Sequence, residues 1–404
     1  MEDDIRSVLG LQGYEVVGVR HGVEGEEVEV ELPREGCCPR CERVTARVHQ
    51  RAKRQSRVEF GFVGQKQLRI LVQRRRLWCK SCGRAFTQAL PGVGKHQRMS
   101  TMAQVTVLGV LAEQSFAGLR RGWGISYGRA RRILLRLQVP WCDWGQLVGE
   151  AGPVHLGIDE HSYRGRDLLI TLTCLSTRTP IAILPDDRQA SLKAALEAIP
   201  PEVQERIEAV CIDGKEGFRS VAKAVLPQAG VVLDHFHLIQ DANRRLDETR
   251  RLEQGEAKVT LPRWPLLKAQ EQLTPKQAAQ LALLQERFPV IAEQHWVKEQ
   301  LRQLYHCPTP QQAEAHLQRI LLGCEAADDL QTVLWGKSLR HWRKEILAYF
   351  RIPITNAYTE GCHTKIKLLK RLGYGYRNVQ IYIRKMLLAF LPRSFDALAP
   401  HLLT

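Results

Sequence analysis

The sequence lacks the segments that would carry a protein into or through a membrane. No apolar run approaches the roughly 18 residues that a bilayer-spanning helix needs. The opening stretch, MEDDIRSVLG, is acidic and has none of the apolar character of a signal peptide. We therefore expect a cytoplasmic protein with no membrane partner. Repeats and low-complexity tracts are also missing. The shares of hydrophobic (44%) and charged (25%) residues match ordinary globular chains and exclude a disordered one.

Acidic residues are in short supply. The chain has 43 aspartates and glutamates against 59 lysines and arginines, which gives a formal net charge of +16. A surplus of this size favours a polyanionic partner, and nucleic acid is the leading candidate. The length of 404 residues predicts two or three domains, each able to bury its own core.

The eleven cysteines are an odd number and are unevenly spread, but four of them form two C-x-x-C pairs. Cys38 and Cys41 make the first pair, and Cys79 and Cys82 make the second. In a cytosolic protein such pairs bind metal more often than they form disulfides. Because each short turn can point two thiolates at one ion, we predict a structural Zn²⁺ site within a β-rich module. Cys37 remains an alternative ligand to Cys38.

Three helical segments follow this module, over residues 101–113, 116–121 and 127–137. Ser126 is the expected N-cap of the last one. That helix has apolar residues for packing on one side and three arginines on another, namely Arg129, Arg132 and Arg136. The pattern predicts a helix-turn-helix that contacts DNA through these arginines. A basic structural bundle fits the pattern nearly as well.

Three apolar runs in the middle of the chain each end in an aspartate, at Asp159, Asp213 and Asp234. Runs of this kind are typical of buried strands in an α/β sheet. Ligands of such sheets bind near the carboxyl ends of the strands, so these aspartates are expected to converge. Clustered carboxylates repel one another, and their hard oxygen ligands favour Mg²⁺ or Mn²⁺ as the neutralising ion.

The order of the predicted elements in this region is also informative. Two further apolar runs, at residues 168–172 and 180–184, lie between the first two aspartates, and a helix is expected near 190–199. Three consecutive strands, a helix and a fourth strand are the order of an RNase H-like fold. Residues 238–350 then read as almost purely helical, and a last helical stretch covers about 357–392.

A fourth acidic candidate, Glu360, lies in a basic segment. On a helix it would share a face with His363, Thr364 and Lys367. A carboxylate among cations suits a site that holds both metal and a phosphate backbone, although a solvated basic helix is the commoner meaning of such a segment. The cations expected to contact DNA are Lys365, Lys367, Lys370 and Arg371. Residues 374–378 add aromatic and basic groups suited to nucleic acid.

At these residues the chain resembles DDE transposases of the bacterial ISL3 insertion-sequence family. The resemblance includes the paired cysteines and the helix-turn-helix region. Its more specific parts are Gly157-Ile-Asp-Glu160, Asp213, Asp234-His-Phe-His237 and the motif-bearing stretch from Thr359 to Asn378. One departure is Cys362-His363-Thr364, where the resemblance implies more amide-bearing side chains.

The resemblance implies a catalytic triad of Asp159, Asp213 and Glu360 that also binds Mg²⁺ on an RNase H-like core. Asp234 competes with Asp213 for the second position, and we favour Asp213. Asp234 and His237 resemble an accessory element that accompanies the triad. Two interpretations of His235 and His237 have equal weight. In one they contact DNA or orient the metal site, and in the other they are helix-cap or core residues.

We therefore expect an insertion-sequence transposase that cleaves and transfers DNA strands by two-metal phosphoryl transfer. Its partners would be terminal inverted repeats and target DNA, bound by a homodimer or higher oligomer at the bacterial nucleoid. An inactive zinc and helix-turn-helix regulator is the alternative function. The expected divisions are a zinc-binding module (1–98), a helix-turn-helix region (99–145), a first core segment (150–240), a helical insertion (241–350) and C-terminal core helices (351–404).

Overall fold

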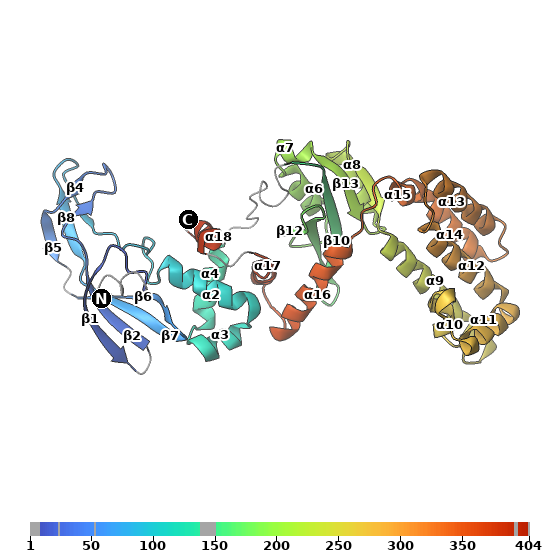
Figure 1. The fold of residues 1–404 in the computed structure, drawn as a ribbon, viewed down its shortest axis with the longest axis horizontal. Helices are drawn as coiled ribbons and strands as arrows, with labels where there is room; N and C mark the ends of the chain where they lie inside the picture. The colour runs from blue at the N-terminus through green and yellow to red at the C-terminus, as the bar shows by residue number, and fades with distance from the viewer. Residues whose placement is uncertain (1–8, 23–24, 52–53, 138–150, 392–394, 403–404) are drawn as a thin grey trace. The chain divides into compact units, whose positions relative to one another are not determined.

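The computed structural model describes residues 9–22, 25–51, 54–137, 151–391 and 395–402. The chain divides into two compact units, one of Met1–Trp141 with Lys365–Thr404 and the other of Cys142–Thr364. Several sheets and many helices confirm the expected mixed α+β class (Figure 1). Among the described residues, no helix combines the length and apolar character needed to span a bilayer. Residues 138–145 of the predicted helix-turn-helix region lie outside the described part of the chain.

The first unit begins with three small sheets. Its largest sheet buries alternate side chains, including Val28, Val30 and Ile70, in one apolar cluster, because successive side chains of a strand point to opposite faces. This sheet has the order β1 (Glu15–Gly22), β2 (Gly25–Glu31), β7 (Lys66–Val72), β6 (Ser56–Val63). The two others consist of β3 (Gly36–Cys37) with β4 (Val44–Thr45), and of β5 (Val48–Arg51), β8 (Arg75–Cys79) and β9 (Arg84–Thr87).

Three helices with serine N-caps follow in the same unit. They are α2 (Thr101–Glu113), α3 (Phe116–Trp123) and α4 (Tyr127–Arg136). Ser126 caps α4 as predicted, because its side chain accepts a hydrogen bond from the backbone N–H of Arg129. The sequence predicts one helical stretch at the end of the chain. The structure breaks it into two helices, α16 (Ala357–Leu372) and α17 (Val379–Leu388). Short segments α18 (Phe395–Leu398) and η2 (Ala399–Leu402) end it.

The second unit contains one five-stranded sheet. Its order is β12 (Thr179–Ile183), β11 (Asp167–Cys174), β10 (Val154–Arg164), β13 (Ile207–Ile212), β14 (Gly230–Leu233). The first three strands are antiparallel neighbours, whereas β13 and β14 run parallel to β10. The run that ends at Asp159 in the sequence is part of a longer strand, because β10 continues to Arg164 as a hairpin with β11.

The two faces of this sheet differ in chemistry. Even-numbered residues of β10, such as Leu156 and Ile158, belong to the apolar core together with α6 (Gln189–Glu197) and α8 (Glu216–Val225). A short helix, α7 (Pro201–Gln204), precedes β13. Odd-numbered residues place Gly157, Asp159 and His161 on the opposite face. The polar face is therefore built by strict alternation along one strand.

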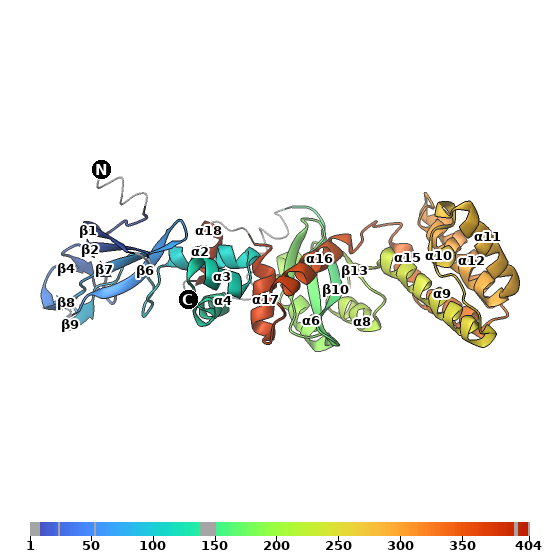
Figure 2. The same ribbon diagram turned by 90° about the horizontal axis from the view of Figure 1, so that it is seen from below.

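The remaining helices lie between β14 and α16 in the chain and form two apolar clusters, one around Trp335 and Leu317 and another that includes Leu266 and Leu281. They pack beside one another in both views (Figures 1 and 2). They comprise α9 (His235–Ala257), α10 (Trp264–Leu267), η1 (Gln270–Gln272), α11 (Pro275–Arg287), α12 (Pro289–Leu304), α13 (Pro310–Glu325), α14 (Leu330–His341) and α15 (Arg343–Ala348).

Candidate functional site

Three aspartates stand side by side on adjacent strands of the second unit. Ile158 pairs with Ile212, and Ile212 pairs with Leu233, so the next residue of each chain segment is an aspartate. These residues are Asp159, Asp213 and Asp234. Parallel register therefore lines up the three carboxyl groups predicted from the apolar runs. Their common location is where β13 and β14 end and β10 continues past them.

Helix α16 approaches the same face at unusually close range. A β-carbon on Gly157 would lie 2.6 Å from the hydroxyl oxygens of both Thr173 and Thr359, and 2.7 Å from Asn356 Oδ1. The two threonine hydroxyls are 2.7 Å apart, and Asn356 donates a hydrogen bond of 3.0 Å to the Ile158 carbonyl. These contacts hold the start of α16, and with it Glu360, against the polar face of β10.

Glu360 and two histidines surround Asp159, which is 3% exposed. His237 Nε2 lies 3.9 Å from Asp159 Oδ1 and 3.6 Å from Glu360 Oε1. His363 Nδ1 lies 3.6 Å from Asp159 Oδ2 and 4.0 Å from Glu360 Oε2. One ligand atom each from Asp159, Glu360 and His363 fall within 4.8 Å of one another. The structure thus brings together the first and last residues of the predicted triad.

The electrostatics of this cluster are those of crowded, buried carboxyl groups. Burial raises the pKa of Asp159 to about 7; the charges of Glu360 and Asp213 add to this rise, while His237 opposes it. Burial also raises the pKa of Asp213 to about 6, with the charge of Glu160 as the next cause. Asp159 Oδ2 and Asp213 Oδ1 are buried and receive no hydrogen bond from the described residues. Ionised carboxylates in this state call for a cation.

Asp213 also borders a cavity of about 630 Å³. Three cations line that cavity, namely Lys215, Arg244 and Arg245. Lys215 forms an ion pair with Glu160, which occupies an even-numbered position of β10. Arg244 and Arg245 both pair with Asp241, which also lines the cavity, so Asp213 borders a space whose cations are engaged in ion pairs.

Asp234 differs from the other two aspartates because its oxygens have partners. His237 Nδ1 donates a hydrogen bond of 2.9 Å to Asp234 Oδ2, and the backbone N–H of Asn356 donates one of 3.3 Å to Oδ1. The bond to Asp234 raises the pKa of His237 to about 9. His235 instead packs against the rings of Tyr305 and Tyr349 and is half-buried. Asp234 is therefore hydrogen-bonded to His237, whereas His235 has aromatic neighbours.

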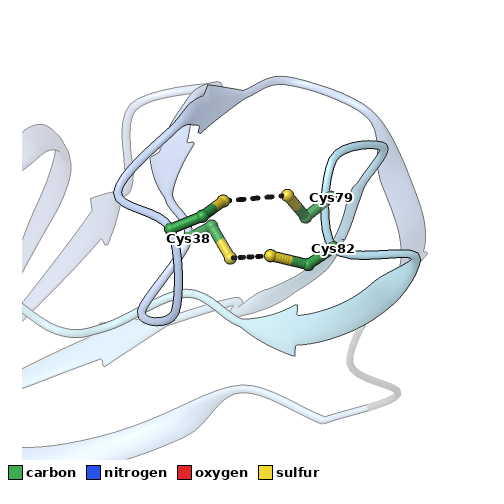
Figure 3. A group of neighbouring side chains, drawn as sticks. Cys38, Cys79 and Cys82 are labelled. Atoms are coloured by element: carbon green, nitrogen blue, oxygen red, sulfur yellow. Dashed lines mark hydrogen bonds between the residues drawn. The ribbon is translucent and has the colours of Figure 1, made fainter.

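The paired cysteines meet in the first unit (Figure 3). Cys38 and Cys41 lie in the turn between β3 and β4, and Cys79 and Cys82 lie at the turn between β8 and β9. The Sγ atoms of Cys38 and Cys82 are 4.0 Å apart, and those of Cys41 and Cys79 are 3.6 Å apart. Cys37 is not part of this group; its thiol contacts the Glu42 carbonyl.

The cysteine group fits one tetrahedral ion. Zinc–sulfur bonds of about 2.3 Å place tetrahedral sulfur ligands about 3.8 Å apart, close to both measured separations. Backbone hydrogen bonds from Arg40 and Cys41 lower the pKa of the Cys38 thiol to about 7, which favours the thiolate form that binds metal. The geometry is compatible with zinc in a closed structural site.

A basic cavity of about 590 Å³ lies in the first unit beside α4. Its arginines come from strands β6 and β7, from the segment just before α2, and from α4. They are Arg57, Arg69, Arg98, Arg129, Arg132 and Arg136. Arg129 contacts both carboxylate oxygens of Glu59 at 2.5 and 2.6 Å, and Arg57 forms an ion pair with Glu27, so a carboxylate already engages each of these two cations. Arg132 and Arg136 bond to polar groups without charge.

The cations predicted on α16 have different surroundings. Lys365 donates a hydrogen bond of 2.6 Å to the Ala389 carbonyl and lies over the Phe390 ring. Lys367 and Arg371 are exposed, and Lys370 is half-buried. The structure therefore uses Lys365, which is itself exposed, to attach α16 to the end of α17.

Several residues around the carboxylates were not singled out from the sequence. Thr171 contacts both His161 and His363, while Thr173 and Asn356 fix the start of α16. A signal for the threonines was present, because Leu168–Cys174 is an apolar strand interrupted by hydroxyl groups two positions apart. That spacing marks one polar face of an otherwise buried strand.

Comparisons with known proteins agree with the resemblance. A family model described as Transposase, that of the ISL3 group of DDE transposases, matches residues 156–386. The transposase for insertion sequence element IS1001 of Bordetella parapertussis is 26% identical over 404 aligned positions, covering 96% of this chain and 97% of that protein. The transposase for insertion sequence element IS1557 of Mycobacterium tuberculosis is 24% identical over 274 positions, covering 60% of this chain and 62% of that protein. A solved Drosophila P element transposase strand transfer complex aligns with a TM-score of 0.40 and 11% identity, covering 73% of this chain and 93% of that chain.

Proposed function

Because the chain belongs to the ISL3 family of DDE transposases, we propose that it binds the terminal inverted repeats of its insertion sequence and catalyses DNA strand cleavage and strand transfer. The observation that carries this proposal is the placement of Asp159 beside Asp213 on adjacent strands, with Glu360 brought to the same face by α16. A bacterial protein with this activity works on the nucleoid in the cytoplasm.

Asp159, Asp213 and Glu360 are the proposed catalytic residues and the ligands of Mg²⁺ or Mn²⁺. The fit is supported by two buried carboxylate oxygens that receive no hydrogen bond from the described residues, on Asp159 and Asp213. When bound, such ions activate the attacking oxygen and stabilise the leaving oxygen of a phosphoryl transfer. Oxygen ligands suit these ions, and a pair of ionised carboxylates at this depth needs their charge.

The neighbouring residues have supporting roles in this proposal. Asp234 is hydrogen-bonded to His237 and so holds that ring beside Asp159 and Glu360. The cations of the adjoining cavity, such as Lys215 and Arg244, offer charge to the phosphates of a strand that reaches the carboxylates. We assign Asp213 as the second catalytic aspartate because Asp234 is already engaged by its own partners.

The first unit is proposed to bind DNA. Helices α2 to α4 are interpreted as a helix-turn-helix with α4 as the recognition helix, supported by the arginine-lined cavity along it. Arg129, Arg132 and Arg136 are the proposed contacts there. The cysteine group would hold Zn²⁺ and so fix the small sheets next to this surface. The cations of the segment after Glu360 are proposed as further DNA contacts, namely Lys365, Lys367, Lys370 and Arg371.

Residues 150–240 and the start of the 351–404 segment would form an RNase H-like core interrupted by the helical insertion of 241–350, an interpretation supported by the antiparallel-then-parallel order of the five strands. The rest of that last segment, from Lys365 onward, belongs to the first compact unit and not to the unit that contains the sheet. Residues 1–98 and 99–145 would form the DNA-binding front end. Because an element has two ends, we propose that a homodimer or higher oligomer is the active assembly.

The test uses the full chain, Mg²⁺ and a DNA fragment that carries the inverted repeats flanking the reading frame. A transposase cuts this DNA at the repeat boundary and joins the resulting ends to a target plasmid. An inactive regulator retards the same fragment in a gel without cutting it in either Mg²⁺ or Mn²⁺. That second result would overturn the proposed activity while leaving the DNA-binding part intact.

A further inference from the structure

His363 lies on α16 one turn after Glu360, and only 2% of it is exposed. Its Nδ1 atom faces Asp159 Oδ2 at 3.6 Å and Glu360 Oε2 at 4.0 Å. Both distances are too long for hydrogen bonds. A ring nitrogen that faces two carboxylates within ion-pair range but beyond hydrogen-bond range leaves room for a cation that all three groups share.

The separations are short enough for one divalent ion to reach all three side chains. Ligand bonds of about 2.1 Å allow two ligand atoms to be at most about 4.2 Å apart. The distances of 3.6 and 4.0 Å from the His363 nitrogen lie within this limit, so small side-chain movements would bring the atoms onto one ion. Asp159 Oδ2, one of the two facing oxygens, is buried and receives no hydrogen bond from the described residues.

A chain of hydrogen bonds orients the His363 ring. The Thr171 hydroxyl lies 3.0 Å from His363 Nε2 and 2.9 Å from His161 Nδ1. A hydroxyl has one proton, so it donates to one ring and accepts from the other. If His363 Nε2–H donates, the lone pair of its Nδ1 faces the carboxylates. A fixed N–H on the far side is the usual support of a histidine that binds metal.

We infer that His363, through Nδ1, is a third protein ligand of the divalent ion held by Asp159 and Glu360. This inference rests on the proposed function, since it concerns an ion of the same site. It adds a nitrogen donor to a set otherwise made of oxygens, and imidazole favours Mn²⁺ and later transition ions over Mg²⁺. The chain should therefore bind Mn²⁺ more tightly than carboxylates alone would.

The test measures Mn²⁺ bound to the full chain at less than one equivalent by pulsed electron paramagnetic resonance, which detects ¹⁴N bonded directly to the ion. His363→Asn removes the imidazole, and His237→Gln removes the competing nitrogen donor at the same carboxylates. We expect the ¹⁴N coupling in the natural chain and in His237→Gln. We expect it to vanish in His363→Asn, with Mn²⁺ affinity reduced at least about tenfold and the Mn²⁺ to Mg²⁺ affinity ratio lowered.

A matched pair of variants tests the orienting chain. Thr171→Val removes the hydroxyl between the two histidines and should weaken Mn²⁺ binding about 10-fold to 100-fold. Thr249→Val removes a buried hydroxyl that bonds to Gln294 between α9 and α12 instead. It should leave the Mn²⁺ to Mg²⁺ ratio unchanged even if stability falls.

Two results would overturn the inference. One is Mn²⁺ bound without any ¹⁴N coupling in the natural chain, and the other is a coupling that survives His363→Asn but disappears in His237→Gln. In both cases the carboxylate site and the proposed function stand. A chain that binds neither Mn²⁺ nor Mg²⁺ at Asp159 would instead reject the proposed function along with the inference.

Discussion

Gly157 of β10 and Thr359 of α16 are so close that a β-carbon on the glycine would lie 2.6 Å from the threonine hydroxyl oxygen. Real β-carbons essentially never approach another heavy atom at that distance, and Thr173 and Asn356 crowd the same point. The absence of a side chain at residue 157 therefore sets how near α16, and with it Glu360, comes to the carboxylates on the sheet.

The change Gly157→Ala should destabilise the second unit. Overpacking a buried contact typically costs about 1–3 kcal/mol, and α16 must move away from β10 to relieve it. DNA cleavage should fall by more than the loss of folded protein explains. Gly361→Ala is the control, because a β-carbon there meets nothing within 4 Å and alanine favours a helix. Urea unfolding of both variants provides the measurement, and equal stability for the two would contradict this account.

The stability of the metal-free protein should fall as pH rises from about 5 to 7. The folded state holds protons on Asp159 and Asp213 up to pKa values of about 7 and 6, whereas the unfolded chain releases them near 4. His237, with its pKa raised to about 9, continues the loss above pH 7. Mg²⁺ should therefore raise the melting temperature more at pH 8 than at pH 5.5.

The variant Asp159→Asn isolates this effect from the other titrating groups. Its melting temperature should depend less on pH between 5 and 7 than that of the natural chain, since one of the raised carboxyl groups is gone. A Mg²⁺-induced shift that is equal at pH 5.5 and pH 8 in the natural chain would argue against carboxylates as the ligands.

Zinc content should distinguish Cys41 from Cys37. Cys41→Ser removes one of the four clustered thiols, so purified protein should contain less than one zinc per chain and should be cleaved readily by protease within residues 1–98. Cys37→Ser should keep its zinc, because that thiol lies outside the cluster. Metal analysis and limited proteolysis of both variants test this, and equal zinc content in the two would reject the assigned ligands.

The arginine cavity beside α4 should set the salt dependence of DNA binding. Glu59→Gln removes the charge that engages Arg129, so binding should tighten and the slope of log affinity against log salt should steepen by about one. Arg132→Ala should reduce that slope by about one. Fluorescence anisotropy with inverted-repeat DNA at several salt concentrations measures both. Slopes that change in neither variant would locate the DNA contacts elsewhere.

Local features of this fold could be predicted from the sequence because they depend on neighbouring residues. Ser126 is the N-cap of α4, as its side-chain chemistry predicts. Asp159, Asp213 and Asp234 each follow an apolar run, and the register of the strands aligns them. The cysteine pairs also met as expected. In each case hydrophobic periodicity, capping chemistry or ligand spacing carries the information.

Features that depend on distant parts of the chain could not be predicted in this way. Arg129 is engaged by Glu59, which is 70 positions away, and His363 bonds to Thr171 across 192 positions. The break between α16 and α17 has a local sign in Gly375, whose φ of +88° suits glycine, but the helical periodicity on either side concealed it. Tertiary contacts decide these cases.

The most direct test of the proposed function measures binding and cleavage in one reaction with Asp159→Asn. This change keeps the size of the side chain but removes the charge that Asp213 and Glu360 would share with it around the ion. We expect the variant to bind inverted-repeat DNA with the affinity of the natural chain and to cut neither strand in Mg²⁺. Cleavage at the natural rate by a folded Asp159→Asn protein would contradict the assignment of this site.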